Sequence, residues 1–305
     1  MGSILGTVVS KSRNNVRVHA VGLDYLCFFR GKVRGRGGGQ LPIAVGDKVL
    51  ISITSSGEGI VEEVRPRCSE LVRHTAGGKP VVVAANLDQV LLVLSAASPS
   101  PRWSLVDRVL VASHRQDLEP AICVNKTDLV RDDQGMVREI ESRLALYGEL
   151  GYPTFSISAT TGHGVDPLVT WLRDRLTVLT GHSGVGKSPL LNPLNDRLDI
   201  VTGALSESTG KGKHTTTAVS LYSMPFGGFV ADTPGFRDFA LWGLEPADIG
   251  RFYREFEPHL GGCRFSDCLH SGEPDCEVVQ ALKRGEISKE RYDSYLRIMR
   301  VHSAG

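Results

Sequence analysis

The chain has 305 residues, of which 41% are hydrophobic and 23% charged, and its formal net charge is +1 at pH 7. This composition is that of a globular protein, and it excludes binding to nucleic acid through overall charge. The N-terminus lacks the basic start and long apolar run of a signal peptide, and no apolar run reaches the roughly 20 residues that span a bilayer. We therefore expect a cytoplasmic protein of about two or three domains.

The first 67 residues predict a small β-barrel. Short β-branched or aromatic runs such as VRVHAV and KVLISI are separated by turn clusters such as SRNN and SSGEG. About five short strands in this length favour an oligonucleotide-binding (OB) barrel, with an SH3-like barrel as the nearest alternative. The next segment, RPRCSELVRHTAGGKP, has the composition of a linker.

From about residue 81, apolar strand-like runs alternate with amphipathic helix-like segments. QVLLVLSAA, AICVN, TFSISA and TVLTG are the strand-like runs. This alternation predicts a parallel sheet with helices on both faces. Such sheets bind ligands at the carboxyl ends of their strands, which is where the next motifs are found.

The stretch GHSGVGKS matches the phosphate-loop pattern G-x-x-x-x-G-K-[ST] between a predicted strand and a predicted helix. Its glycines let backbone N–H groups turn toward phosphate oxygens, and the helix N-terminus adds partial positive charge. Lys187 is expected to contact the β- and γ-phosphates, and the Ser188 hydroxyl to bind Mg²⁺. The residues assigned to phosphate binding are Gly181, His182, Ser183, Gly184, Val185, Gly186, Lys187, Ser188 and Pro189.

Two prolines depart from the usual sequence after such a loop. Pro189 lies in the first helical turn and has no N–H to offer the α-phosphate, whereas Pro193 lies deeper, where we expect it to kink the helix. A hydrogen bond to a charged group contributes about 1.5–3 kcal/mol. The sequence therefore predicts nucleotide binding that is weakened but not abolished.

The run CVNKTD supplies an N-K-x-D motif, which is typical of proteins that bind guanine. The Asp128 carboxylate can accept from guanine N1–H and from its exocyclic amine, and adenine offers neither donor in that geometry. Lys126 is expected to lie along the base and brace the phosphate loop, while Asn125 ties loops together. The full set of predicted base contacts is Asn125, Lys126, Thr127 and Asp128, with Ser158 and Ala159 of SISA offering a backbone amide to guanine O6.

The run FVADTPGF predicts a magnesium- and γ-phosphate-sensing segment, with Asp232 near Mg²⁺ and the Gly235 amide near the γ-phosphate. The preceding GKGKHTTTA offers Thr215, Thr216 and Thr217 as the threonine that completes the Mg²⁺ shell, and we favour Thr216. The alternative is a solvated threonine-rich turn.

These motifs run in the reverse of the usual GTPase order, because the guanine-binding elements precede the phosphate loop. The sequence is therefore that of a circularly permuted GTPase, in which the sensing segment leads directly into the C-terminal region. Phe236 follows Gly235, where many GTPases place a water-orienting glutamine. His214 is a candidate catalytic residue in its place, or else simply a surface histidine.

The run CRFSDCLHSGEPDC brings Cys263, Cys268, His270 and Cys276 within 14 residues. Thiolate and imidazole ligands in this number suit a tetrahedral structural Zn²⁺ site, and clustering in a cytoplasmic protein favours metal over disulfides. Reduced surface thiols are the alternative.

Taken together, NKTD, GHSGVGKS, GKGKHTTT, DTPGF and the cysteine cluster resemble the RsgA (YjeQ) family of ribosome-assembly GTPases over nearly the whole chain. The resemblance implies an OB-fold barrel at residues 1–67, a permuted P-loop GTPase domain at 68–238 and a small helical zinc-binding domain at 239–305. It also implies that the four cluster residues bind zinc and that His214 is catalytic. Pro189, Pro193 and Lys213 depart from the family pattern.

The resemblance further implies late maturation of the small ribosomal subunit, with GTP hydrolysis stimulated by that subunit, and a barrel that binds ribosomal RNA. The barrel carries four basic residues in or near one loop, which suit RNA phosphates or are simply a solvated loop: Arg30, Lys32, Arg34 and Arg36. We expect a monomer that uses GTP, Mg²⁺ and one Zn²⁺. The alternative function is an rRNA-binding scaffold with weak nucleotide binding and little hydrolysis.

Overall fold

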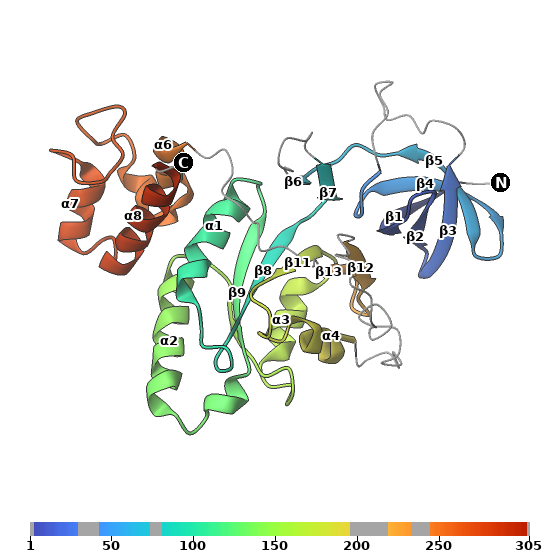
Figure 1. The fold of residues 1–305 in the computed structure, drawn as a ribbon, viewed down its shortest axis with the longest axis horizontal. Coiled ribbons are helices and arrows are strands. Elements are labelled where there is room, and N and C mark those ends of the chain that lie inside the picture. Colours follow the sequence, from blue (N-terminus) through green and yellow to red (C-terminus); the bar gives the residue numbers. More distant parts are fainter. Residues whose placement is uncertain (1–2, 30–42, 74–80, 196–218, 233–244, 304–305) are drawn as a thin grey trace.

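The computed structural model describes residues 3–29, 43–73, 81–195, 219–232 and 245–303. A β-barrel, a central α/β sheet and a helical region with the cysteine cluster follow one another along the chain (Figure 1). The barrel and the helical region lie at opposite ends of the molecule, with the sheet between them. Within these ranges, no helix has the length and apolar character needed to cross a membrane. This architecture confirms the fold class predicted from the sequence.

The barrel is closed, with strand order β1-β2-β3-β5-β4. All neighbouring strands are antiparallel except β3 and β5. This order is OB-like, so the OB expectation is confirmed over the SH3-like alternative. The strand bounds are Ile4–Lys11, Asn15–Ala20, Leu23–Phe29, Lys48–Ser55 and Glu58–Val64.

The predicted linker after the barrel is partly wrong, because it contains a strand. β6 (Glu70–Arg73) pairs antiparallel with β7 (Val81–Ala85). Arg67 anchors the start of this segment to the barrel through the fully buried Asp47 carboxylate, with Nε–Oδ1 at 2.7 Å and Nη2–Oδ2 at 2.8 Å. A polar stretch is therefore held in place by pairing partners that its own composition does not reveal.

Within the described ranges, the central sheet has six strands in the order β10-β9-β8-β11-β13-β12. Neighbours are parallel except β12, which is antiparallel to β13. The strands are β8 (Gln89–Ser95), β9 (Glu119–Asn125), β10 (Thr154–Ser156), β11 (Leu176–Thr180), β12 (Ser220–Ser223) and β13 (Phe229–Asp232). The guanine-motif strand β9 precedes the phosphate-loop strand β11 in the chain, as the permuted order requires.

Helices cover both faces of the sheet, as the alternating pattern predicts (Figure 1). Leu92 and Leu94 of β8 face the core beneath α1 and α2, whereas Leu91 and Val93 face the core beneath α3 and α4. The helical segments are η1 (Trp103–Leu105), α1 (Val106–His114), η2 (Thr127–Val130), α2 (Gln134–Glu149), α3 (Val165–Leu172) and α4 (Lys187–Asn195). α4 continues for two residues past Pro193.

The C-terminal region packs against α1 and α2 through an aromatic core. Tyr253, Phe256 and Tyr295 are at most 1% exposed, and they belong to the same buried cluster as the α1 and α2 face of the sheet. The two parts therefore share one continuous core. The elements here are α6 (Pro246–Ile249), η4 (Gly250–Phe252), η5 (Arg254–His259), α7 (Glu277–Arg284) and α8 (Lys289–Ser303).

Candidate functional site

The phosphate loop follows β11 and closes tightly against the end of β8. Gly181 has φ +140°, and a Cβ there would lie 2.1 Å from the Val93 carbonyl oxygen. Gly186 has φ +93°, and a Cβ there would lie 2.5 Å from Asn125 Nδ2. Both positions therefore require glycine, because the backbone conformation and the close neighbours leave no room for a side chain. This supports a built phosphate loop over an accidental glycine-rich turn.

Lys187 opens α4 and its side chain folds back over the loop. Its Nζ donates to the carbonyl oxygens of Gly181 at 2.8 Å and His182 at 2.9 Å. The ammonium is thus held beside the backbone that would surround a phosphate. Ser188 is exposed at the start of the helix, so its hydroxyl is accessible to a cation.

Asn125 joins the guanine-binding loops to the phosphate loop. Its Oδ1 accepts from the amides of Lys126 at 2.7 Å and Ala159 at 3.0 Å, and its Nδ2 donates to the Val185 carbonyl at 3.1 Å. The residue is 1% exposed. Asn125 therefore connects its own loop to the loop at Ala159 and to the phosphate loop through these hydrogen bonds. The Ala159 amide, expected to reach guanine O6, already has this partner and must share or exchange it to contact a base.

Lys126 braces the same loop from the outside. The residue has φ +64°, and its Nζ donates to the carbonyl oxygens of Ser98 and Gly184, both at 2.6 Å. Ser98 belongs to residues 96–102, which link β8 to α1. The sequence did not single out this loop, because a backbone carbonyl acceptor leaves no signal in residue identity.

Arg102, at the end of that loop, makes a second contact with the phosphate loop. Its Nη1 lies 3.1 Å from His182 Nε2. Residues 96–102 therefore touch both the guanine motif and the phosphate loop, through Lys126 and His182.

Asp128 has the chemistry expected of a guanine-binding carboxylate. Its Oδ1 is buried and has no hydrogen-bond partner among the described residues. A buried carboxylate oxygen needs a donor, and guanine offers two adjacent N–H groups. Thr127 fixes the loop beside it, donating to the Ile157 carbonyl from its amide at 3.2 Å and from Oγ1 at 2.9 Å. Ser158 is fully buried and its Oγ accepts from the Thr161 amide at 3.1 Å.

Asp232 is the last residue of β13 and pairs in register with Leu179 of β11. Its backbone therefore lies beside the strand that leads into the phosphate loop. Other predicted site residues lie outside the described residues, and they are His214, Thr216, Gly235, Arg30, Lys32, Arg34 and Arg36.

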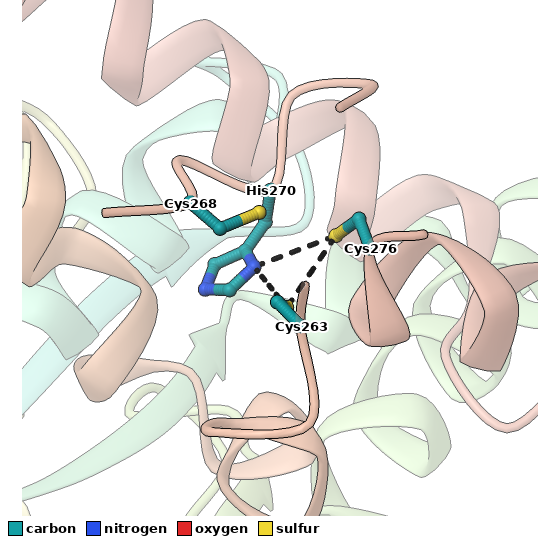
Figure 2. Close-up of side chains that lie close together, drawn as sticks. All are labelled: Cys263, Cys268, His270 and Cys276. Atoms are coloured by element: carbon teal, nitrogen blue, oxygen red, sulfur yellow. Dashed lines mark hydrogen bonds between the residues drawn. The ribbon is translucent and has the colours of Figure 1, made fainter. Parts of the chain in front are cut away.

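A second site lies in the C-terminal region, where the three cysteines and His270 converge (Figure 2). The Sγ atoms of Cys263 and Cys276 lie 3.9 Å apart, and each lies 3.5 Å from His270 Nδ1. With Zn–S bonds of ~2.3 Å and a Zn–N bond of ~2.0 Å, tetrahedral geometry separates two sulfurs by about 3.8 Å and sulfur from nitrogen by about 3.5 Å. Cys263, Cys276 and His270 therefore match tetrahedral Zn²⁺, and the ligand atoms of all four side chains, with Cys268, lie within 4.8 Å of one another.

The protonation states of these ligands make metal binding pH-dependent. Burial raises the pKa of the Cys268 thiol to about 12 and raises the pKa of Cys276. Burial lowers the pKa of His270, which favours the neutral imidazole that binds metal. Metal uptake must therefore displace thiol protons, so acid favours release.

The loop that carries His270 is held from two sides. The Glu273 carboxylate accepts from the amides of Leu269 at 3.0 Å, Ser271 at 2.7 Å and Gly272 at 3.1 Å. From α8, Tyr292 Oη donates to the His270 carbonyl at 2.8 Å and Tyr295 Oη donates to the Leu269 carbonyl at 2.6 Å. The ligand loop is thus positioned by contacts beyond the ligands themselves, as metal sites require.

Fold and site together define a circularly permuted P-loop protein of the guanine-nucleotide-binding class, with an OB-like barrel and a cysteine–histidine cluster that could hold a metal ion. The RsgA GTPase family model matches residues 64–242. A curated relative from Gemmatimonas aurantiaca, named small ribosomal subunit biogenesis GTPase RsgA, is 40% identical over 273 residues, 88% of this chain and 87% of the relative. The chain belongs to the RsgA GTPase family.

Two solved structures have the same architecture. The crystal structure of YjeQ from Thermotoga maritima superposes with a TM-score of 0.81 at 33% identity, covering all of both chains. The structure of YloQ, described as a circularly permuted GTPase, superposes with a TM-score of 0.76 at 29% identity, covering 99% of this chain and 96% of that one. The likeness extends over the barrel and C-terminal region as well as the sheet.

Proposed function

We propose that this protein is a GTPase that acts in late maturation of the small ribosomal subunit, hydrolysing GTP to GDP and phosphate when it binds that subunit. Family membership supports hydrolysis, and the names of the curated relatives support the small subunit as partner. The observation that carries guanine specificity is the buried Asp128 Oδ1, which has no partner in the described part of the chain. We assign residues 1–67 to the barrel, 68–238 to the GTPase domain and 239–305 to the zinc domain.

The phosphate loop would bind GTP or GDP through its backbone amides and Lys187, with Ser188, Thr216 and Asp232 as ligands to Mg²⁺. When bound, Mg²⁺ neutralises the charge that develops on the phosphates. Gly235 would sense the γ-phosphate, and His214 would act in hydrolysis. Phe236 stands where many GTPases have a water-orienting glutamine, and phenylalanine cannot orient water, so another residue such as His214 must do so.

The barrel would contact ribosomal RNA through Arg30, Lys32, Arg34 and Arg36. The cluster of Cys263, Cys268, His270 and Cys276 would hold one structural Zn²⁺, since no ligand position is left for a substrate. We further propose that the protein works as a cytoplasmic monomer.

One observation favours a second candidate function, an rRNA-binding scaffold with little hydrolysis. Pro189 removes an amide from the first turn of α4, where the intrahelical hydrogen bonds begin only with the Leu190 amide donating to the Gly186 carbonyl at 2.9 Å, so the lost donor is one that would face a phosphate. Loss of this amide weakens the phosphate site without removing it.

GTP hydrolysis with and without purified small subunits separates the two functions, with ATP as the control nucleotide. The GTPase predicts turnover that is specific for GTP and strongly raised by small subunits. Binding to small subunits without raised turnover would instead support the scaffold.

A further inference from the structure

A buried cation joins the C-terminal region to the central sheet domain. The Arg291 side chain in α8 is 2% exposed and forms an ion pair with Asp107 of α1. On its other side, Arg291 donates from Nε to Glu255 Oε1 at 2.6 Å and from Nη2 to Oε2 at 3.2 Å. The Tyr147 hydroxyl of α2 donates to Asp107 Oδ1 at 2.9 Å. The network therefore connects both sides of the domain interface.

The network specifies one arrangement of the two domains. The side chains of Asp107 and Glu255 are each 5% exposed, so neither carboxylate can be satisfied by water if Arg291 moves away. Buried ion pairs contribute little net stability relative to apolar packing, but leaving one partner unpaired is strongly unfavourable. Such a pair acts chiefly to exclude other domain positions.

α8 also contacts the metal-ligand loop, through the residues next to Arg291 along the helix. The hydroxyls of Tyr292 and Tyr295 donate hydrogen bonds to the carbonyls of His270 and Leu269, respectively. One helix therefore fixes the cysteine–histidine centre on one side and α1 on the other.

α1 continues this connection to the nucleotide site. It is preceded by residues 96–102, where the Ser98 carbonyl accepts from Lys126 and Arg102 contacts His182. Only three residues separate Arg102 from the start of α1 at Val106. A shift of α1 would therefore displace contacts to both the guanine motif and the phosphate loop.

We propose that Arg291 is a positioning residue, which fixes α1 against the C-terminal domain and so couples the position of that domain to the nucleotide site and to its stimulation by the small subunit. This inference rests on the proposed function for its partner.

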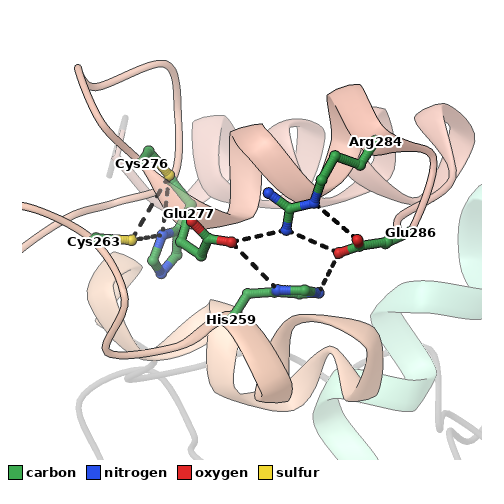
Figure 3. Close-up of polar contacts among 7 residues, drawn as sticks. His259, Cys263, Cys276, Glu277, Arg284 and Glu286 are labelled. Carbon is green, nitrogen blue, oxygen red and sulfur yellow. Dashed lines mark hydrogen bonds and ion pairs between the residues drawn. The ribbon is translucent and has the colours of Figure 1, made fainter.

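The test uses the full-length protein with Arg291→Met, Asp107→Asn and Glu255→Gln combined, which removes the cation and both buried charges together. The interface keeps other contacts, because Arg254 Nη1 donates to the Gly151 carbonyl at 2.8 Å. Arg284→Met is the matched control. Arg284 also binds two carboxylates, Glu277 and Glu286, but all three lie within the C-terminal domain (Figure 3).

Four quantities are measured: zinc content, GDP affinity, GTP hydrolysis with and without small subunits, and amide hydrogen exchange in α1. We expect the triple variant to keep its zinc and its basal GTP hydrolysis. Its subunit-stimulated hydrolysis should fall about tenfold, which is a typical coupling between two sites. The amide hydrogens of α1 should exchange faster than in the wild type. Arg284→Met should match the wild type. If the triple variant does not fold, Arg291→Lys replaces it, because lysine keeps the charge but loses the two-sided contact.

The inference would be overturned if small subunits stimulate the triple variant as strongly as the wild type, whether or not amide exchange in α1 changes. Failure of small subunits to stimulate the wild type would count against the proposed function. In that case exchange in α1 alone decides whether Arg291 fixes the helix.

Discussion

Pro189, directly after the phosphate-loop motif, is the residue at which this chain departs from the usual start of the following helix. It is exposed in the first turn of α4, beside the loop whose backbone donors would surround the phosphates. The intrahelical hydrogen bonds begin with the Leu190 amide, which donates to the Gly186 carbonyl at 2.9 Å, so the helix does not need a donor at residue 189, whereas a phosphate would. The missing amide of Pro189 therefore lowers nucleotide affinity but does not change the fold of the loop.

Pro189→Ser should therefore tighten GDP binding. One restored hydrogen bond to a charged phosphate corresponds to about 10- to 150-fold in Kd. Calorimetric titration with GDP measures the change. Pro193→Ala is the control, because it removes a proline from the same helix without adding a donor near the phosphates. Equal GDP affinity in Pro189→Ser, Pro193→Ala and the wild type would show that the missing amide does not limit binding.

His114, on α1, gives the domain interface a pH dependence. Burial, with Arg254 and Arg291 nearby, lowers the pKa of His114 to about 4 from its usual 6.5. Because the unfolded chain takes up the proton at higher pH, the stability due to neutral His114 is present above about pH 6.5 and is lost as the pH falls through about 4.

His114→Gln should flatten this loss, because glutamine does not titrate. Unfolding free energies from denaturant titration at several pH values between about 7 and 4 measure the slope. The exposed His163→Gln variant is the control and should keep the wild-type slope. The explanation fails if His114→Gln and wild type lose stability in parallel.

At the scale of elements, we expect the cysteine–histidine loop to depend on a bound metal for its structure. The loop between η5 and α7 carries few apolar residues of its own, and its ligands match a tetrahedral zinc site. Short loop-rich segments of this kind fold around their metal.

Cys276→Ser should therefore lose bound zinc and lower the thermal stability of the C-terminal domain. Elemental analysis of the purified protein measures the first effect and a thermal unfolding scan the second. Cys68→Ser changes an exposed thiol outside the cluster and should keep one zinc per chain. Full zinc content in Cys276→Ser would remove that residue from the ligand set.

Elements differ in how far the sequence predicts them. The permuted order of motifs, the barrel and the cysteine cluster can be predicted, because each depends on contiguous runs whose spacing sets the chemistry. β6 could not be predicted, since it depends on pairing with β7 and on the Arg67–Asp47 ion pair. Asp107 and Arg291 are 184 residues apart, and neither belongs to a motif. Contacts of that kind appear only once the chain is folded.

The whole molecule places the two ends of the chain on opposite sides of one nucleotide-binding sheet. The barrel leads into β7 and β8, and the cysteine–histidine domain docks on α1 and α2 (Figure 1). A subunit that contacts both outer domains would therefore act on the GTPase domain from two directions. This arrangement suits a protein whose residence on a large partner is set by its nucleotide.

The most direct test of the proposed function is co-sedimentation of the protein with purified small subunits in the presence of GDP or of a non-hydrolysable GTP analogue. We expect the protein to sediment with the subunits in the GTP-analogue state and to be released in the GDP state. Equal association with both nucleotides would contradict this function, because GTP hydrolysis could then not release the protein from the subunit.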